Sequence, residues 1–336
     1  MRSLVALVVV FGCEASPPQP APRRLDPPIR WAAACAEAEA RLGRLHERER
    51  MPGVQAAVIG RDGVIWQAAR GTTEAGAPLT PTMPMRLASV SKVVTAMLLA
   101  RMVAAGRIEL DAQVSTYVPS WPADPPVTVR ELAGHLGGIR HYNISDLGRI
   151  ERHATLADAA RDIFAADPRE AVAGTRYHYS SWGYTLLGAA LEGAAQMPYL
   201  ALLDRELAWP IRIVGDPDAT ARWPAGGLLA TASDVAQLGR LVLPEAGYLP
   251  RALLATMLTS QHTVDGKPTG VGLGWRVGTD AAGRKIAHHA GNMQSARSVV
   301  VVYLELGVVV ALLSNERNTP SDVELAAGTL AEPFLD

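Results

Sequence analysis

Apolar residues form short runs near both ends of this chain and longer, helix-like stretches in its middle. Residues 54–59 and 64–69 are two strand-like runs, and Arg61-Asp62-Gly63 between them is typical of a hairpin turn. Further strand-like runs occur late in the chain, at 271–277, 298–304 and 308–313. These positions predict a sheet that is assembled from the two ends of the chain.

Helical periodicity dominates the rest. The alanine- and glutamate-rich stretch 31–50 predicts a helix that ends before Pro52-Gly53. The stretch 89–105 is apolar almost all round and stops at Gly106, which is typical of a buried helix. Further helices are expected at 156–165, 183–195 and 200–207, and after Pro320. Strands at both ends around a helical middle predict an α+β fold with an inserted, mostly helical domain.

The N-terminus has the pattern of a secretion signal. One arginine precedes an apolar run that ends at Gly12 and is shorter than the ~20 residues that span a bilayer. Because residues 10–13 resemble a bacterial lipoprotein processing box, residues 1–13 are expected to be a lipoprotein-type signal peptide with Cys13 as the lipidation site. An ordinary cleaved signal and an uncleaved apolar anchor are the alternatives. The anchor would place the protein in the bacterial cell envelope, facing outside the cytoplasm.

The composition of the chain after residue 13 indicates where its segments begin and end and which kinds of partner it can bind. Residues 14–30 are rich in proline and predict an extended tether, followed by a catalytic domain at 31–336. Its sheet would come from 31–80 and 225–336, and its helical part from 81–224. The net charge of −1 gives no general attraction for nucleic acid. Cys35 is the only cysteine besides Cys13, so no disulfide framework is predicted.

The first candidate chemistry is the pair Ser89 and Lys92. Only three of the 32 basic residues are lysines, which makes a lysine inside a motif more informative. Residues i and i+3 share a helix face, so the hydroxyl and the amine can meet. Apolar neighbours would desolvate the amine, lower its pKa and let it take the serine proton. The alternative is structural: Ser89 caps the helix and Lys92 extends to solvent.

Two further polar segments carry candidate residues. Tyr179 lies in a polar turn before an apolar helix, where a tyrosine near an ammonium can act as a general base; aromatic packing is the alternative. In the segment 288–291, Gly291 would let a substrate approach the backbone closely. The paired histidines point apart on a strand and no cysteine or carboxylate cluster completes a ligand set, so neither a metal nor another cofactor is expected.

Four segments together resemble a known superfamily. They are Arg86-Leu-Ala-Ser-Val-Ser-Lys92, Tyr179-Ser-Ser-Trp-Gly-Tyr-Thr-Leu-Leu-Gly188, Val271-Gly-Leu-Gly-Trp275 and His289-Ala-Gly291. Their order resembles the serine beta-lactamase and penicillin-binding-protein superfamily, in its class C and D-alanyl-D-alanine carboxypeptidase branch. Segments 127–132 and 135–142 are similar to the mitochondrial serine beta-lactamase-like protein and its bacterial relatives.

The resemblance implies an antiparallel sheet flanked by helices, a helical domain beside it and an active site in the cleft between them. It also implies that Ser89 is the acylated nucleophile, Lys92 its proton partner and Tyr179 the general base. The backbone N–H groups of Ser89 and Asn292 would form the oxyanion hole. Lys267-Pro-Thr-Gly270 looks like the third motif of the family but is rejected, because it precedes the strand where that motif belongs.

Two departures from the family pattern affect the expected substrate. Ser181 stands where many members have asparagine, and His289 replaces a lysine. Because those residues help hold the substrate amide and carboxylate, the departures argue against true beta-lactamase activity. With an ordinary pKa of ~6.5, His289 is expected to be mostly uncharged at neutral pH and to gain charge as the pH falls.

The expected function is therefore that of a serine hydrolase. It would act through an acyl-serine intermediate on a peptide, amide or ester, with a small molecule or peptide as substrate. The alternative is a catalytically weak pseudoenzyme, or a binding protein of the cell envelope, that uses the same pocket. A Ser-His-Asp hydrolase that uses His289 is disfavoured because the chain has no Gly-x-Ser-x-Gly elbow.

Overall fold

A six-stranded antiparallel sheet joins the two ends of the chain. The computed structural model describes residues 29–150, 153–207, 211–316 and 322–335. The strand order is β2-β1-β9-β8-β7-β6. The strands are β1 (Gly53–Gly60), β2 (Gly63–Gly71), β6 (Arg276–Thr279), β7 (Lys285–Met293), β8 (Ala296–Tyr303) and β9 (Val308–Ser314). Because β1 pairs with β9, the N-terminal hairpin closes onto the C-terminal strands, and the α+β fold is confirmed.

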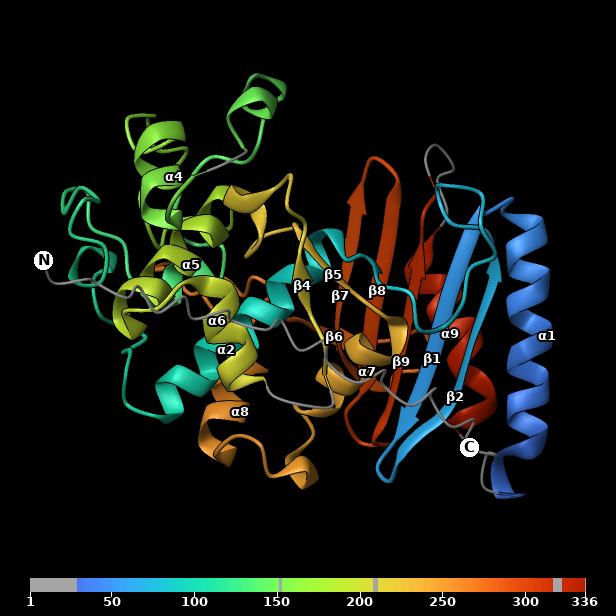
Figure 1. Cartoon of the computed structure of the whole chain (residues 1–336). Helices are drawn as coiled ribbons and strands as arrows, with labels where there is room; N and C mark the ends of the chain where they lie inside the picture. Colours follow the sequence, from blue (N-terminus) through green and yellow to red (C-terminus); the bar gives the residue numbers. More distant parts are fainter. Residues whose placement is uncertain (1–28, 151–152, 208–210, 317–321, 336) are drawn as a thin grey trace, which may run out of the picture.

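Both faces of this sheet are buried. α1 (Ala32–Arg48) and α9 (Val323–Ala331) cover one face, and α7 (Ala232–Arg240) packs on the other (Figure 1). Along β1, Ala56 and Val58 point into the core beneath α1 and α9, whereas Ala57 and Ile59 point into the core beneath α7. A strand with two buried faces has a continuous apolar run, which is why such strands could be predicted from the sequence.

The helical part lies beside the sheet. Its helices are α2 (Ser91–Ala104), α3 (Val129–Ala133), α4 (Leu156–Ile163), α5 (Ser181–Ala195), α6 (Tyr199–Glu206) and α8 (Arg251–Met257). A small sheet of β3 (Met85–Arg86), β5 (Leu228–Ala230) and β4 (Val214–Gly215) also belongs to this region. Short 3-10 turns are η1 (Ile29–Trp31), η2 (Ala88–Val90), η3 (Val114–Thr116), η4 (Ile144–Arg149), η5 (Thr220–Arg222), η6 (Pro244–Ala246) and η7 (Glu332–Phe334).

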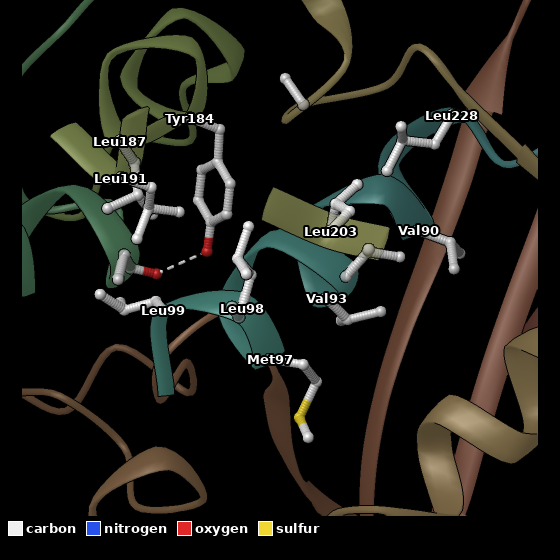
Figure 2. Packing of buried hydrophobic residues seen from close by; sticks show 14 of the residues in the cluster. Val90, Val93, Met97, Leu98, Leu99, Tyr184, Leu187, Leu191, Leu203 and Leu228 are labelled. Atoms are coloured by element: carbon white, nitrogen blue, oxygen red, sulfur yellow. Dashed lines mark hydrogen bonds between the residues drawn. The ribbon is translucent and has the colours of Figure 1, made fainter. Parts of the chain in front are cut away.

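α2 and α5 form the buried centre of the helical part. Leu98 of α2 lies near Tyr184 of α5, whose hydroxyl donates to the Ala133 carbonyl at 2.8 Å (Figure 2). This packing fixes the N-terminal ends of α2 and α5 relative to each other. Among the described residues, no single helix is long and apolar enough to cross a membrane. The bent pair α5 and α6, at 73°, passes that test by length and composition only.

Three details differ from the sequence prediction. Residues 271–275 do not form a strand, because Gly270 and Gly274 adopt positive φ values of 73° and 78° and the chain turns before β6. The α-helix begins at Ser91 rather than at Ser89. Ile29 and Arg30, assigned to the tether, form η1; the rest of the tether and Cys13 lie outside the described residues.

Candidate active site

Ser89 lies in the single turn of η2, between β3 and α2. It is half-buried and lines a pocket of about 560 Å³. The preceding Ala88 has a φ of 44°, an uncommon conformation for a residue with a side chain. The N-cap positions of η2 and α2 are Leu87 and Val90, and neither helix has a side-chain cap bond. The Ser89 hydroxyl is therefore not used as a helix cap.

Lys92 is completely buried beneath Ser89. Its Nζ donates to Ser89 Oγ at 3.2 Å, to Ser181 Oγ at 2.9 Å and to the Ala225 carbonyl at 2.7 Å. Burial lowers the pKa of Lys92 well below its ordinary value, and the positive charge of Arg222 acts in the same direction. An uncharged amine has two hydrogens and a lone pair. It can donate to Ser181 and Ala225 while the lone pair accepts the Ser89 proton.

Tyr179 lies on the opposite side of Ser89, in the loop before α5. The centre of its ring is 4.8 Å from Lys92 Nζ. Burial raises the pKa of Tyr179, although its hydrogen bond with Ser89 and the charge of Arg276 partly oppose the rise. Tyr179 is therefore protonated at neutral pH. The role of general base that the resemblance implies for Tyr179 stays a prediction.

Two histidines of the segment 135–142 hold the loop that carries Tyr179. The backbone N–H of Ser180 donates to His135 Nδ1 at 3.1 Å, and that of Ser181 donates to His141 Nδ1 at 3.1 Å. The His135 ring also lies 4.5 Å from the Tyr179 ring. Burial lowers the pKa of His135 well below its ordinary value and that of His141 to about 4. Both rings are thus neutral and free to accept these bonds at neutral pH.

The end of β7 forms the third side of the site. β6 pairs with Lys285–His288 only, so the following residues of β7 have an open edge beside η2. A Cβ on Gly291 would lie 2.6 Å from the Leu87 carbonyl oxygen and 2.9 Å from the Ser89 nitrogen. Glycine is therefore required here because the η2 backbone approaches closely; the predicted approach of a substrate to Gly291 stays a prediction. Asn292 is exposed at the rim of the pocket that Ser89 lines.

His289 does not titrate as the sequence suggested. It is only 3% exposed, and its Nδ1 lies 2.8 Å from the Ala290 carbonyl oxygen. Burial lowers the pKa of His289 to about 3, with a further contribution from the charge of Lys92. The expectation that this ring gains charge as the pH falls through ~6.5 is therefore wrong. A desolvated imidazole stays neutral over the physiological range.

Sequence reasoning missed several residues that line the pocket. The segment 86–92 and its companions identified Ser89, Tyr179, His289 and Asn292, which do share one pocket. The polar lining residues to which the sequence analysis gave no role in the site are His141, Arg276, His288 and Glu324. His141 and Arg276 lie in or next to quoted motifs and could have been found there. Glu324 is far from any motif along the chain.

Lys267 is not among the residues that line this pocket; it is exposed and paired with Asp265 at 2.7 Å, whereas Gly270 of the same segment does line the pocket. Within the described part of the chain, no group of three or more histidine, cysteine, aspartate or glutamate side chains could hold a metal ion.

The structure thus brings together a buried lysine, a serine above it, a tyrosine beside both and an open strand edge. The Beta-lactamase family model matches residues 38–332, and this chain belongs to that family. The fold and the superfamily predicted from the motifs are thereby confirmed.

Named relatives show how diverse that family is. The chain is 28% identical over 205 residues to "Esterase EstB" of Burkholderia gladioli, covering 55% of this chain and 52% of that protein. It is 24% identical over 313 residues to the human "Serine beta-lactamase-like protein LACTB, mitochondrial", covering 63% and 57% respectively. It is 28% identical over 324 residues to "Penicillin-binding protein 4" of Amycolatopsis lactamdurans, covering 82% and 84%. The chain thus spans only about half of the first two relatives.

Solved structures agree on the fold. "SurE with D-Leu" matches with a TM-score of 0.77 at 25% identity, over 90% of this chain and 76% of that one. The octameric penicillin-binding protein homologue from Pyrococcus abyssi matches with a TM-score of 0.73 at 21% identity, over 89% and 77%.

Proposed function

We propose that this protein is a serine hydrolase that forms an acyl-Ser89 intermediate on an ester, amide or peptide. The observation that carries the proposal is the position of Lys92, completely buried with its Nζ 3.2 Å from Ser89 Oγ and among neutral acceptors. Burying a lysine without a carboxylate is costly for folding. Such a lysine has a functional use, because an amine with a lowered pKa beside a nucleophile can accept its proton.

The chemistry follows from the three side chains. Lys92 takes the Ser89 proton while Oγ forms a bond to the substrate carbonyl carbon. The backbone N–H groups of Ser89 and Asn292 stabilise the resulting oxyanion. Collapse breaks the bond to the leaving group, which receives a proton from Tyr179, and Lys92 returns its proton to the tyrosine. Water then attacks the acyl-serine by the same route, regenerating Ser89 and releasing the acid.

Arg276, rather than His289, is the cation that would meet a substrate carboxylate. Arg276 lines the pocket and is half-buried at the start of β6, whereas His289 is neutral. An arginine can bind a carboxylate through two parallel hydrogen bonds and keeps its charge at every physiological pH. Relatives named as an esterase and a penicillin-binding protein support an acyl substrate, and the arginine favours one with a nearby carboxylate.

Active-site labelling tests the proposal. The wild-type protein should react with a fluorescent fluorophosphonate and gain the mass of one acyl group from an ester substrate, whereas Ser89→Ala should do neither. Ser91→Ala is a matched control, because the Ser91 hydroxyl accepts from the Leu228 backbone N–H at 3.2 Å and does not meet Ser89. Equal labelling of Ser89→Ala and the wild type would refute the mechanism. A folded wild type that never becomes acylated would favour the binding-protein alternative.

The location of the protein is a second, separate proposal: Cys13 carries a lipid, and the protein is anchored in the cell envelope. Its support is the apolar run that ends at Gly12 and the proline-rich segment that follows Cys13. Several acyl chains would give stable anchoring, since one chain binds membranes only weakly. Cys13→Ser should release the protein from the membrane fraction or leave its precursor unprocessed. Unchanged fractionation with an unmodified N-terminus would contradict the anchor.

A further inference from the structure

The far end of the active-site pocket carries two opposite charges. Arg276 comes from β6, and Glu324 comes from the first turn of α9, on the far side of the sheet edge. His288 lies between them, since it pairs with Arg276 across the β6–β7 ladder and its Nδ1 is 3.2 Å from Glu324 Oε1. All three line the pocket that contains Ser89. The short length of β6 leaves the sheet edge open, so one pocket reaches residues of both sheet faces.

Glu324 is a carboxylate that the catalytic chemistry does not use. Its side chain is 46% exposed, and its hydrogen bond with His288 lowers its pKa. It is therefore ionised at neutral pH and accessible to a ligand. Among the described residues no ion pair joins Arg276 to Glu324, although the charge of Arg276 also helps to lower the pKa of Glu324. The two charges are thus separate receptors, and a ligand can meet both at once.

We infer that this end of the pocket binds a substrate residue that carries a carboxylate and, at a distance, an ammonium group. Arg276 receives the carboxylate and Glu324 the ammonium, as in a peptide that ends in a residue with a basic side chain. This inference rests on the proposed function, because the carbonyl to be attacked must lie at Ser89. A ligand with the carboxylate alone leaves Glu324 facing solvent. A ligand with the ammonium alone is repelled by Arg276.

Product-like inhibitors test the inference without requiring amide hydrolysis. Nα-acetyl-lysine and Nα-acetyl-norleucine have the same carboxylate and nearly the same side-chain length, but only the first has an ammonium group. They are compared as competitive inhibitors of the hydrolysis of a neutral ester, in both stereochemical series. Because Glu324 is half-exposed, its ion pair is expected to tighten inhibition by the lysine compound about two- to fivefold.

Three variants test which residue causes the tighter inhibition by Nα-acetyl-lysine. Glu324→Gln keeps the shape and removes the charge, so the lysine-to-norleucine ratio of inhibition constants should become one. Arg276→Gln should weaken both inhibitors. Glu305→Gln, which removes an exposed acid paired with Lys285 at the β8–β9 turn, should change neither. A purely structural role of Glu324 would lower the melting temperature and affect both inhibitors equally.

The outcomes are distinguishable. A ratio of one in the wild type, or a wild-type ratio that persists in folded Glu324→Gln, overturns the inference while the hydrolase proposal stands. If the wild type neither hydrolyses the ester nor accepts a label on Ser89, the proposed function itself has failed.

Discussion

Two cations lie close to the start of α5, and their surroundings act on their charge in opposite ways. Lys92 is completely buried, and the Arg140 side chain is 14% exposed. Arg140 is held by two carboxylates: its Nη1 is 2.7 Å from Asp146 Oδ2 and its Nε is 2.5 Å from Asp167 Oδ2. Its hydrogen bond with Asp146, followed by that with Asp167, raises the pKa of Arg140 above its ordinary value. Lys92 has only neutral acceptors, and its pKa falls. Arg140 is placed to stay charged and Lys92 to lose its charge.

The difference separates a structural from a functional burial of charge. Asp146 also accepts a hydrogen bond from Trp182 Nε1 at 3.0 Å, so the Arg140 pair joins η4 to the buried face of α5. A paired charge with its other hydrogen bonds satisfied fixes the relative position of elements. A buried amine without a counter-ion contributes little to folding, and the geometry around it serves proton transfer instead. Removing the Asp146 partner of Arg140 should therefore lower the free energy of unfolding, whereas removing the Lys92 amine should lower kcat/KM.

The largest effect is expected for Lys92→Met. Removing the proton acceptor should lower kcat/KM at least about 10⁴-fold, which is more than about 5 kcal/mol of transition-state stabilisation. Because a methionine of similar volume needs no counter-ion, the free energy of unfolding should stay the same or rise. Ester turnover and urea denaturation measure the two quantities. Lys285→Met, which replaces an exposed lysine, is the control. A stable and active Lys92→Met would contradict the functional role given to Lys92.

Asp146→Ala should do the reverse. It leaves Arg140 with Asp167 alone and orphans the Trp182 N–H, so the free energy of unfolding should fall by about 3 kcal/mol. Turnover per folded molecule should change far less than for Lys92→Met. Asp111→Ala breaks the exposed pair with Arg130 and should cost under about 1 kcal/mol in the same urea experiment. Equal losses for both variants would show that the Arg140 pair has no special structural role.

The smallest effect concerns His289, a buried group that also stays neutral. Its pKa is about 3 when folded, so below ~6.5 the unfolded chain binds a proton that the folded chain resists. Stability should consequently fall as the pH drops through this window. Relative to His289→Gln, the wild type should lose about 1 kcal/mol more between pH 7 and pH 5.5, measured by urea unfolding. Parallel pH profiles for the two proteins would argue that the ring titrates normally.

The same neutrality has a catalytic consequence. The ratio of kcat/KM for a carboxylate-bearing ester over its neutral methyl ester should stay constant between pH 8 and pH 5.5, since arginine side chains do not titrate in this range. A ratio that rises as the pH falls would indicate that His289, rather than Arg276, recognises the substrate carboxylate.

The sequence by itself predicted strands β1, β2, β8 and β9, the buried helices α2 and α5, and the residues proposed to react. It did not predict β7, and most of the predicted run 271–277 is not a strand. Strands β1, β8 and β9 are apolar on both faces, and a continuous apolar run between turn residues is visible without tertiary information. Ser89 and Lys92 are three residues apart, so local geometry alone brings them together; the 3-10 turn at η2 keeps residues i and i+3 aligned.

Only the tertiary structure decided the electrostatics and the far end of the pocket. Whether His289 titrates near ~6.5 or near 3 depends on desolvation, which is set by everything packed around the ring. The need for Gly291 comes from the η2 backbone, about 200 residues earlier in the chain. Arg276 and Glu324 share a pocket because β6 is short and the first turn of α9 brings Glu324 beside His288 of β7. Such contacts between distant segments leave no periodic signal, and so a single sequence does not reveal them.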